Sequence, residues 1–411
     1  MNRLPIVHPG PKFRSSVPDP VATDPSQIPP LARLPEEWAV VAQAMGGRAF
    51  HGKQIFRWIH VRGITDPAKM SDLPATLRSV LMAAGVGETL DVTHERRATD
   101  GTRKLLVTMR DGASVETVLI PEITRGPSGL PAPVAVEPDA DVAALDDDEN
   151  EDEPVGAKKR VTQCISTQVG CAMGCVFCAS GVAGLKRQMR ADEIVSQILV
   201  GRRRLDEDEA LRGVVFMGMG EPLHNYDATV RALRLLTHRE GIGLSSRRVT
   251  VSTSGLVPEI ARLGEDFRGQ IGLAISLHAP TDEVRSRLMP INRRYPIGEL
   301  MAALRAYPLP QRRRITIEYT LVVGQNDTVE DARLVARLLV GIPVKVNLIP
   351  MNPIEGSSLG PPDLTGVLAF QRVLCERGYS CFIRRRRGDD VSAACGQLAL
   401  LGAKRKVRMA L

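Results

Sequence analysis

The sequence predicts an α/β protein whose main domain is a partial (β/α)6 barrel, with a small N-terminal helical domain and a short β extension. From Arg160 onward, six β-rich runs alternate with helical segments, and polar or glycine-rich loops follow several of these runs. Repeated strand–helix units require right-handed crossovers, which place the strands parallel in one sheet. Functional residues are therefore expected at the carboxyl ends of the strands.

Three segments precede the barrel. Residues 1–32 are rich in Pro and polar residues without a sustained period, so we expect a disordered tail. Residues 33–88 contain three stretches with helical periodicity, separated by Gly or Pro, and predict a compact helical domain. Residues 89–121 predict three short strands, because the Asp-Gly pairs at 100–101 and 111–112 are typical of hairpin turns.

An acidic insertion separates the β extension from the barrel. Residues 122–158 combine Gly, Pro and Ala with ten acidic residues between 137 and 153, a composition that predicts disorder. The barrel is expected over residues 159–397, and residues 398–411 form a basic C-terminal tail. The six expected strands lie in RVTQCISTQV, GVVFMGM, RVTVSTS, IGLAISLH, RITIEYTLVV and PVKVNLIP.

Composition and charge restrict the class of protein. The chain is 43% hydrophobic and 25% charged, as in ordinary globular proteins, and no apolar run is long enough to cross a bilayer or resembles a secretory signal. Seven cysteines, three of them within eight residues, indicate metal or redox chemistry in a reducing compartment. We therefore expect a cytoplasmic protein that does not contact membranes.

The basic character of the chain favours a polyanionic partner. The net charge is +7, and it becomes +17 when the ten acidic residues of the insertion are left out. One basic cluster alone is most simply a solvated surface, but five together favour a nucleic acid. The clusters are Lys158–Arg160, Arg202–Arg204, Arg312–Arg314, Arg384–Arg387 and Lys404–Lys406.

The strongest local signal is a cysteine motif directly after the first barrel strand. Cys171, Cys175 and Cys178 have a C-x3-C-x2-C spacing. Three thiolates on one loop can ligate three irons of a [4Fe-4S] cluster and leave the fourth iron without a protein ligand. The amino and carboxylate groups of S-adenosylmethionine (SAM) can fill that position, which allows reductive cleavage to a deoxyadenosyl radical. A three-cysteine zinc site with a distant histidine is the competing interpretation.

Other strand ends carry groups that suit the same cofactor. Gly218-Met219-Gly220-Glu221 follows the second strand, and Glu221 could accept hydrogen bonds from the ammonium group of SAM. Polar residues also follow the third, fourth and sixth strands, at Ser252–Gly255, Ser276–His278 and Pro350–Pro353. Each loop alone could be an ordinary polar loop, but together they favour a shared site.

These motifs together resemble one known family. The segments QCISTQVGCAMGCVFCASG, FMGMGEPLHNYD, ISLHAPTDEVRSRLMPIN, VNLIPMNPIEG and RRRRGDDVSAACGQL are similar to those of the dual-specificity RNA adenine-carbon-2 methyltransferases, the RlmN-like family. The resemblance extends from about Leu34 to Gln397. It implies methylation of adenosine 2503 in 23S ribosomal RNA and adenosine 37 in transfer RNA, and an RNA-binding accessory role for the helical domain.

The resemblance also assigns roles to individual residues. It implies that Cys171, Cys175 and Cys178 ligate the cluster. The implied SAM contacts are Gly220, Glu221, Ser252, Ser276, Leu277, His278 and Asn352. The implied catalytic residues are Cys395, which is methylated first, Cys164, which resolves the protein–RNA adduct, and Glu116, the proton acceptor.

The chemistry explains why such a relay is needed. Carbon 2 of adenine is electrophilic and has no lone pair, so it cannot attack the sulfonium of SAM. The resemblance implies that Cys395 takes a methyl group from one SAM and that a deoxyadenosyl radical from a second SAM activates this methyl group for addition to the base. Proton loss to Glu116 and attack by Cys164 then release the product and leave a Cys164–Cys395 disulfide. A reductant such as flavodoxin or ferredoxin is implied, and we expect a monomer.

Some features depart from the family or leave alternatives open. GLKRQMRADEI differs from the GFxRNL form common in the family, and the acidic insertion is unusual. Cys375 and Cys381 match no family role, and we expect both in the core of the last helix and strand. The alternatives are a carbon-8 adenine methyltransferase of the antibiotic-resistance type, a non-catalytic iron–sulfur RNA-binding protein, and an activase that acts on another enzyme.

Overall fold

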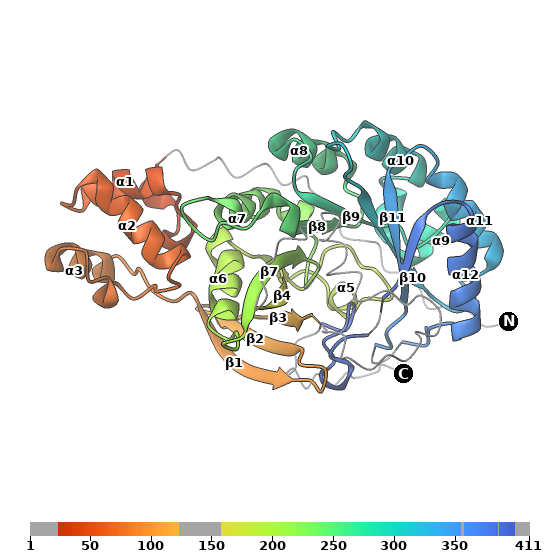
Figure 1. The fold of residues 1–411 in the computed structure, drawn as a ribbon, viewed down its shortest axis with the longest axis horizontal. Helices are drawn as coiled ribbons and strands as arrows, with labels where there is room; N and C mark the ends of the chain where they lie inside the picture. Colours follow the sequence, from red (N-terminus) through yellow and green to blue (C-terminus); the bar gives the residue numbers. More distant parts are fainter. Residues whose placement is uncertain (1–23, 123–157, 355–356, 385, 399–411) are drawn as a thin grey trace, which may run out of the picture.

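One sheet of ten strands runs through the described part of the chain (Figure 1). The computed structural model describes residues 24–122, 158–354, 357–384 and 386–398. The predicted tail before residue 24, most of the acidic insertion and nearly all of the basic C-terminal tail therefore lie outside the described residues. In the described ranges, every helix is too short or too polar to cross a bilayer.

The barrel consists of seven strands, each parallel to its neighbour. The first six coincide with the predicted runs, so the predicted partial barrel is confirmed, and β12 adds one strand at the edge. The strands are β4 (Lys159–Cys164), β7 (Glu209–Phe216), β8 (Val249–Thr253), β9 (Gly272–Ser276), β10 (Ile315–Leu321), β11 (Val344–Pro350) and β12 (Ser380–Ile383).

Helices connect these strands, and most of them lie outside the sheet, whereas α5 lies inside its curve (Figure 1). They are α5 (Ala179–Ala183), α6 (Ala191–Arg202), α7 (Tyr226–Thr237), α8 (Val257–Phe267), α9 (Asp282–Leu288), α10 (Ile297–Ala306), α11 (Val329–Leu338) and α12 (Leu364–Glu376). A short ribbon of β5 (Gln168–Val169) and β6 (Arg187–Gln188) flanks residues 170–178, which carry the three motif cysteines and are called the cysteine loop.

The β extension continues the barrel sheet and is not a separate sheet. Strands β1 (Leu90–Arg97), β2 (Arg103–Met109) and β3 (Ser114–Pro121) form an antiparallel meander, and β3 pairs antiparallel with β4. The predicted hairpin turns are present, because Gly101 and Gly112 have φ angles of 84° and 81°, a region that favours glycine. Val118 of β3 lies directly opposite Cys164 of β4.

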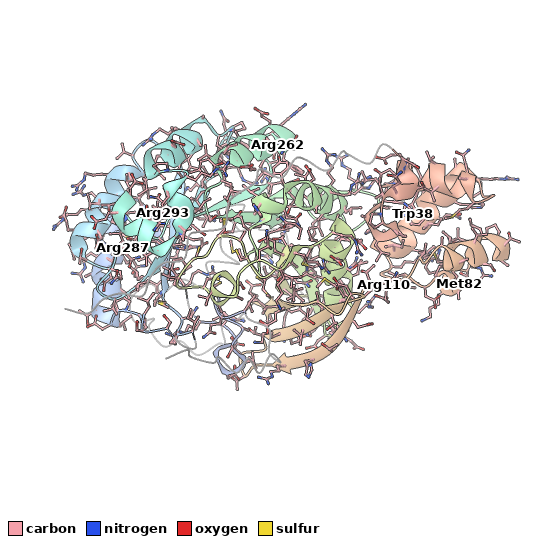
Figure 2. All side chains as sticks on the ribbon, turned by 180° about the vertical axis from the view of Figure 1, so that it is seen from behind. Trp38, Met82, Arg110, Arg262, Arg287 and Arg293 are labelled. Atoms are coloured by element: carbon pink, nitrogen blue, oxygen red, sulfur yellow. The ribbon has the colours of Figure 1, made fainter. Side chains whose placement is uncertain are left out.

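The N-terminal helices form a group at one end of the molecule, where Figure 2 shows Trp38. They are α1 (Pro35–Ala44), α2 (Ala49–His60) and α3 (Ala75–Ala83), and Trp38 is fully buried among them. Arg202 of α6 donates hydrogen bonds to the carbonyl oxygens of His60 (2.8 Å) and Val61 (2.9 Å), which attaches the helical domain to the barrel.

Two expectations for the periphery need correction. Residues 24–32, which we expected in the disordered tail, pack on the fold, because Leu31 and Ala32 are buried and bring apolar surface to the core. Cys381 is buried as expected, but Cys375 is exposed, so its predicted place in the core is wrong. The buried residues of α12 are Val367, Phe370 and Leu374, and Cys375 lies outside this stripe.

Helix α6 approaches strand β4 closely at Gly201. The side-chain amide of Gln163 fills the gap and donates hydrogen bonds to Thr117 Oγ1 (3.0 Å) and the Gln197 carbonyl oxygen (2.7 Å). A Cβ atom on Gly201 would lie 2.3 Å from Gln163 Oε1. Because the hydrogen bonds fix this amide, a larger residue at Gly201 must displace the helix or break the bonds.

We therefore expect Gly201→Ala to lower the free energy of unfolding by about 1–3 kcal/mol, the usual cost of overpacking a core. Gly298 of α10 is the matched control, since a Cβ there meets no atom within 4 Å. Gly298→Ala should raise the free energy of unfolding by up to about 1 kcal/mol through helix propensity. Urea unfolding followed by circular dichroism measures both changes, and equal shifts in the same direction would contradict this prediction.

Candidate active site at the carboxyl ends of the barrel strands

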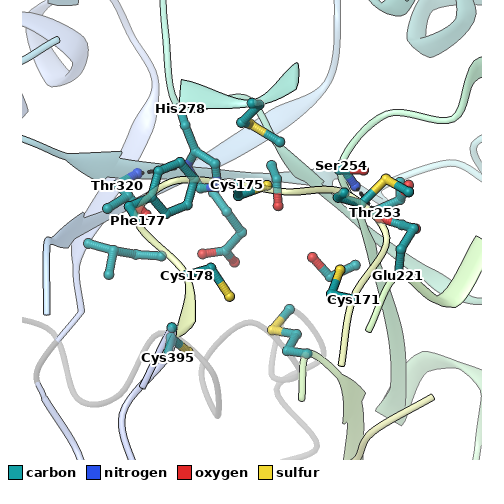
Figure 3. Close-up of a pocket in the computed structure, with 18 of the residues that line it drawn as sticks. Cys171, Cys175, Phe177, Cys178, Glu221, Thr253, Ser254, His278, Thr320 and Cys395 are labelled. Atoms are coloured by element: carbon teal, nitrogen blue, oxygen red, sulfur yellow. Dashed lines mark hydrogen bonds between the residues drawn. The ribbon is translucent and has the colours of Figure 1, made fainter. Parts of the chain in front are cut away.

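A cavity of about 160 Å³ lies at the carboxyl ends of the barrel strands (Figure 3). Its lining comes from the cysteine loop after β4, from the ends of β7 to β11, and from the segment after β12. The cavity therefore brings together residues from separate parts of the sequence, at the place where the fold predicts a site.

The three motif cysteines all line this cavity. Cys171, Cys175 and Cys178 lie on one loop that turns at Gly174, where φ is 67°. Burial is the main cause that raises the pKa of each thiol, to about 12 for Cys171, and the neighbouring thiols raise the pKa of Cys175 further. Three thiolates in such a buried site require bound positive charge, which a metal centre provides.

The donor set suits an iron–sulfur cluster. Cys171, Cys175 and Cys178 lie on one loop and line one cavity together with polar strand ends. Three cysteine ligands can hold three irons of a [4Fe-4S] cluster and leave the fourth iron open to another ligand. Among the residues that the structure describes, no group of three or more His, Cys, Asp or Glu side chains is placed to hold a single metal ion.

The cavity also contains polar atoms that suit a polar cofactor. Asn352 Oδ1 is buried without a hydrogen-bond partner, and Asn352 lines the cavity. Buried polar atoms are normally satisfied, so this atom indicates a position where a ligand would bond. Ser254 also lines the cavity. Gly220, Ser252, Ser276 and His278 line the same cavity.

Glu221 is a buried carboxylate at the end of β7. Its Oε1 accepts a hydrogen bond from the Leu223 backbone N–H (3.1 Å), and its Oε2 accepts one from that of Ser254 (2.7 Å). Burial raises the pKa of this carboxyl, and the two bonds oppose that shift. Glu221 thus joins the ends of β7 and β8 and still faces the cavity, where an ammonium group would neutralise it.

The glycines beside Glu221 serve packing within the protein. A Cβ on Gly220 would lie 2.6 Å from Gln168 Cβ, and one on Gly218 would lie 2.7 Å from the Ile165 carbonyl oxygen. The loop after β7 therefore packs tightly on the segment that follows β4. This packing within the protein is a sufficient reason for glycine at both positions.

His278 is held in one orientation. Its Nδ1 accepts a hydrogen bond from the Thr320 backbone N–H (2.8 Å), and its ring packs edge-to-face on Phe177 with 4.8 Å between ring centroids. Burial, followed by the charge of Arg285, lowers the pKa of His278 to about 3, so the ring is neutral. Because Nδ1 is an acceptor, Nε2 carries the proton and can donate to a ligand.

Arg285 was not identified from the sequence, although it fixes two strand ends. It is fully buried and donates to the carbonyl oxygens of Leu277 (3.0 Å), Ser254 (2.7 Å) and Ser276 (2.9 Å). Leu277 does not line the cavity, so its predicted SAM contact is not visible in the cavity lining. In the sequence Arg285 resembles any surface charge on a helix, and no local signal distinguishes it.

Glu318 is a second residue that sequence reasoning missed. It lines the cavity from β10, accepts a hydrogen bond from Asn347 Nδ2 (3.0 Å) and pairs with Arg384 (3.4 Å). Burial raises the pKa of Glu318 to about 7. An acidic residue within the apolar run ITIEYTL was an available signal, because strands buried on both faces rarely contain charge.

The segment after β12 brings Cys395 into the cavity, and Figure 3 shows it beside Cys178. Asn352 Nδ2 donates to the Cys395 carbonyl oxygen (2.9 Å). The Gly396 carbonyl oxygen accepts from the Ala179 backbone N–H (2.8 Å), and Ser180 Oγ donates to the Leu398 carbonyl oxygen (2.7 Å). We call residues 386–398 the Cys395 loop; it is attached directly to the cysteine loop and α5.

Cys164 and Glu116 lie behind this loop and do not line the main cavity. The pKa of Cys164 is raised first by burial and further by a charge on Cys395, so the two sulfurs are within electrostatic reach of each other. Cys395 also lines a smaller cavity with Val118, the residue opposite Cys164. Glu116 in β3 is fully buried, and its carboxylate pairs with Lys104 (3.3 Å).

Residues of two of the basic clusters form ion pairs with acidic residues of the same chain. Arg203 and Arg204 pair with Glu88 and Glu95, both at 2.9 Å, and Arg387 pairs with Asp100 at 2.9 Å. These contacts join domains and loops, so the number of clusters in the sequence overstates the basic surface available to a nucleic acid. The inference of a polyanionic partner from these clusters is correspondingly weaker.

Comparison with known proteins agrees with this site. Residues 165–339 match the radical SAM superfamily, and residues 36–85 match the ribosomal RNA large subunit methyltransferase N-terminal domain. A crystal structure of a radical SAM methyltransferase from Sphaerobacter thermophilus is 40% identical, with a TM-score of 0.78, over 90% of this chain and 99% of that chain.

Curated relatives match over nearly the whole chain. The dual-specificity RNA methyltransferase RlmN of Sorangium cellulosum is 67% identical over 93% of this chain and 98% of its own length. The RlmN protein of Geobacter sulfurreducens is 44% identical over 86% of this chain and 87% of its own length. With such identity and coverage, the chain belongs to the RlmN family of dual-specificity RNA methyltransferases within the radical SAM superfamily.

Proposed function

We propose that this chain methylates carbon 2 of adenosine in 23S ribosomal RNA, at position 2503, and in transfer RNA, at position 37. Membership of a radical SAM family implies an iron–sulfur cluster and SAM. The observation that carries the proposal is the position of Cys395, which lines the same cavity as the three motif cysteines. An ordinary SAM methyltransferase needs no cysteine there, whereas a methyl carrier is needed for an electrophilic carbon.

The cofactors are assigned to named residues. Cys171, Cys175 and Cys178 would hold a [4Fe-4S] cluster, and SAM would bind between the cluster and the polar strand ends, near Ser254 and Asn352. When bound, the cluster and two SAM molecules per turnover supply a methyl group and a deoxyadenosyl radical. Phe177, Met289 and Met351 contribute buried apolar surface to the cavity wall.

The protein's own residues are proposed to orient the methyl carrier and to accept the proton. Cys395 Sγ carries the methyl group in the cavity, and the Asn352 bond to its carbonyl oxygen holds it there. Glu116 is proposed to accept the proton from the base, and Cys164 to attack Cys395 sulfur so that the product leaves. This last step is supported by the electrostatic proximity of the two thiols.

The proposed substrates set further requirements. The target adenine must leave its stack to reach a buried site, and unpaired adenines in RNA meet this requirement most readily. A one-electron reductant such as flavodoxin or ferredoxin would reduce the cluster, and the chain would act as a monomer. Ribosomal and transfer RNA as substrates imply a cytoplasmic site of action.

The direct test is nucleotide analysis of ribosomal and transfer RNA after incubation with reduced, cluster-loaded enzyme and SAM. We expect 2-methyladenosine in both RNAs, identified by mass spectrometry with chromatographic standards. Detection of 8-methyladenosine would establish the carbon-8 alternative. RNA binding without deoxyadenosine or methylated adenosine would indicate a non-catalytic iron–sulfur protein.

Replacing any motif cysteine with alanine, for example Cys175→Ala, should remove most bound iron and sulfide, because three thiolates are the protein's whole contribution to such a cluster. Cys375→Ala is the matched control, since this exposed thiol lies on α12, away from the cavity lining. Iron and sulfide analysis after anaerobic reconstitution measures the difference. Equal iron content in the two variants would show that the cysteine motif does not bind the cluster.

Cys164→Ala should trap the enzyme on its RNA through Cys395, because the methyl carrier can add to the base but cannot be released. Cys395→Ala should form no adduct, because it lacks the carrier sulfur. A denaturing gel with labelled RNA separates these outcomes. Identical behaviour of the two variants would exclude the cysteine relay.

A further inference from the structure

The first part of the Cys395 loop rests on the β extension. Asp100, in the turn between β1 and β2, accepts a hydrogen bond from the Gly388 backbone N–H (3.1 Å) and pairs with Arg387 (2.9 Å). Asp390 in turn accepts a hydrogen bond from the Thr99 backbone N–H (3.0 Å). The extension therefore helps to determine where the loop, and Cys395 with it, is placed.

Lys104 of β2 makes the innermost of these contacts. Its side chain is 3% exposed, and its Nζ donates to the Ser392 carbonyl oxygen at 2.9 Å while it lies 3.3 Å from Glu116 Oε1. One ammonium group thus bridges the Cys395 loop and the proposed proton acceptor. Burial lowers the pKa of Lys104, and the charge of Glu116 opposes that shift.

Both contacts of Lys104 have a physical consequence. A fully buried carboxylate remains ionised only when a partner compensates its lost hydration, and Lys104 supplies the opposite charge for Glu116. Ser392 has a φ angle of 52°, a left-handed conformation that costs a non-glycine residue about 1 kcal/mol or more. The bond from Lys104 to the Ser392 carbonyl oxygen stabilises this turn, three residues before Cys395.

We propose that Lys104 is a positioning residue that couples the seating of the Cys395 loop to the charge and orientation of Glu116. This inference rests on the proposed function, in which Cys395 carries the methyl group and Glu116 accepts the proton. With the loop seated, the ammonium is fixed between two acceptors, and its charge favours the ionised form of Glu116. When the loop leaves, the ammonium loses the Ser392 carbonyl oxygen and is no longer fixed in its position beside Glu116. Lys104 itself makes and breaks no covalent bond.

Arg103 offers a matched control on the opposite face of the same strand. It is equally buried and pairs with Glu209, and it also donates to the Arg204 carbonyl oxygen (2.7 Å), with no contact to the Cys395 loop. Arg103→Met removes a buried cation from β2 as Lys104→Met does. Any effect specific to the loop must therefore differ between the two variants.

The first measurement is hydrogen–deuterium exchange of residues 386–398 in the cluster-loaded, full-length protein without RNA. In Lys104→Met these amides should exchange about tenfold faster or more, as expected from loss of a hydrogen bond to a charged group. Lys104→Arg should restore protection, and Arg103→Met should leave the loop unchanged. The double variant Lys104→Met/Glu116→Gln removes both charges of this ion pair and should show the same fast exchange.

The second measurement separates positioning from general stability. Lys104→Met should lower kcat by about tenfold or more, with the KM for RNA unchanged. This loss is smaller than the factor of about 10² to 10⁴ that a positioned general base contributes to the rate. Wild-type exchange in both the single and the double variant, or an equal effect of Arg103→Met on the loop, would overturn the coupling. If wild-type enzyme forms no methylated adenosine, the proposed function fails, whereas the exchange experiment still reports whether Lys104 holds the loop.

Discussion

The attachment of the Cys395 loop to the cysteine loop is the constraint on which the site depends. Backbone bonds from Ala179 to Gly396 and the Asn352 bond to Cys395 join segments that are far apart in the chain. They are local contacts between peptide groups and one side-chain amide, and each is modest in energy. Their effect is geometric, because they place a sulfur atom beside a group of thiols that burial alone would keep protonated.

The remaining architecture supports this arrangement from two directions. On the barrel side, Arg285 and Glu221 bond to backbone groups at the ends of β7, β8 and β9, so the polar wall of the cavity is fixed before any ligand binds. On the other side, the β extension continues the barrel sheet through the pairing of β3 with β4 and carries the residues that hold the Cys395 loop. Preorganisation of this kind lowers the free-energy cost of ordering the site when a ligand binds.

The sequence predicted the features that repeat locally or resemble a known family. Strand–helix alternation gave the barrel, the cysteine spacing gave the candidate cluster ligands, and the resemblance drew attention to Cys164 and Cys395. Arg285 and Lys104 could not be found in this way, because each donates to a backbone carbonyl oxygen that only the folded chain brings within reach, that of Ser254 for Arg285 and that of Ser392 for Lys104. Neither hydrophobic periodicity nor residue type identifies a carbonyl acceptor. The exposure of Cys375 and the packing of residues 24–32 likewise depend on tertiary contacts that no local pattern specifies.

The antiparallel pairing of β3 with β4 has a consequence for how this protein tolerates change. Pro121 pairs with Val161, and the Glu122 backbone N–H donates to the Arg160 carbonyl oxygen at 2.8 Å, so the chain departs and returns at adjacent backbone positions. Lengthening a connection between neighbouring ends costs little, since the closure entropy grows only with the logarithm of its length. The connection between β3 and β4 should therefore tolerate added sequence. A reporter domain inserted between residues 123 and 157 would leave the pairing of Pro121 with Val161 intact.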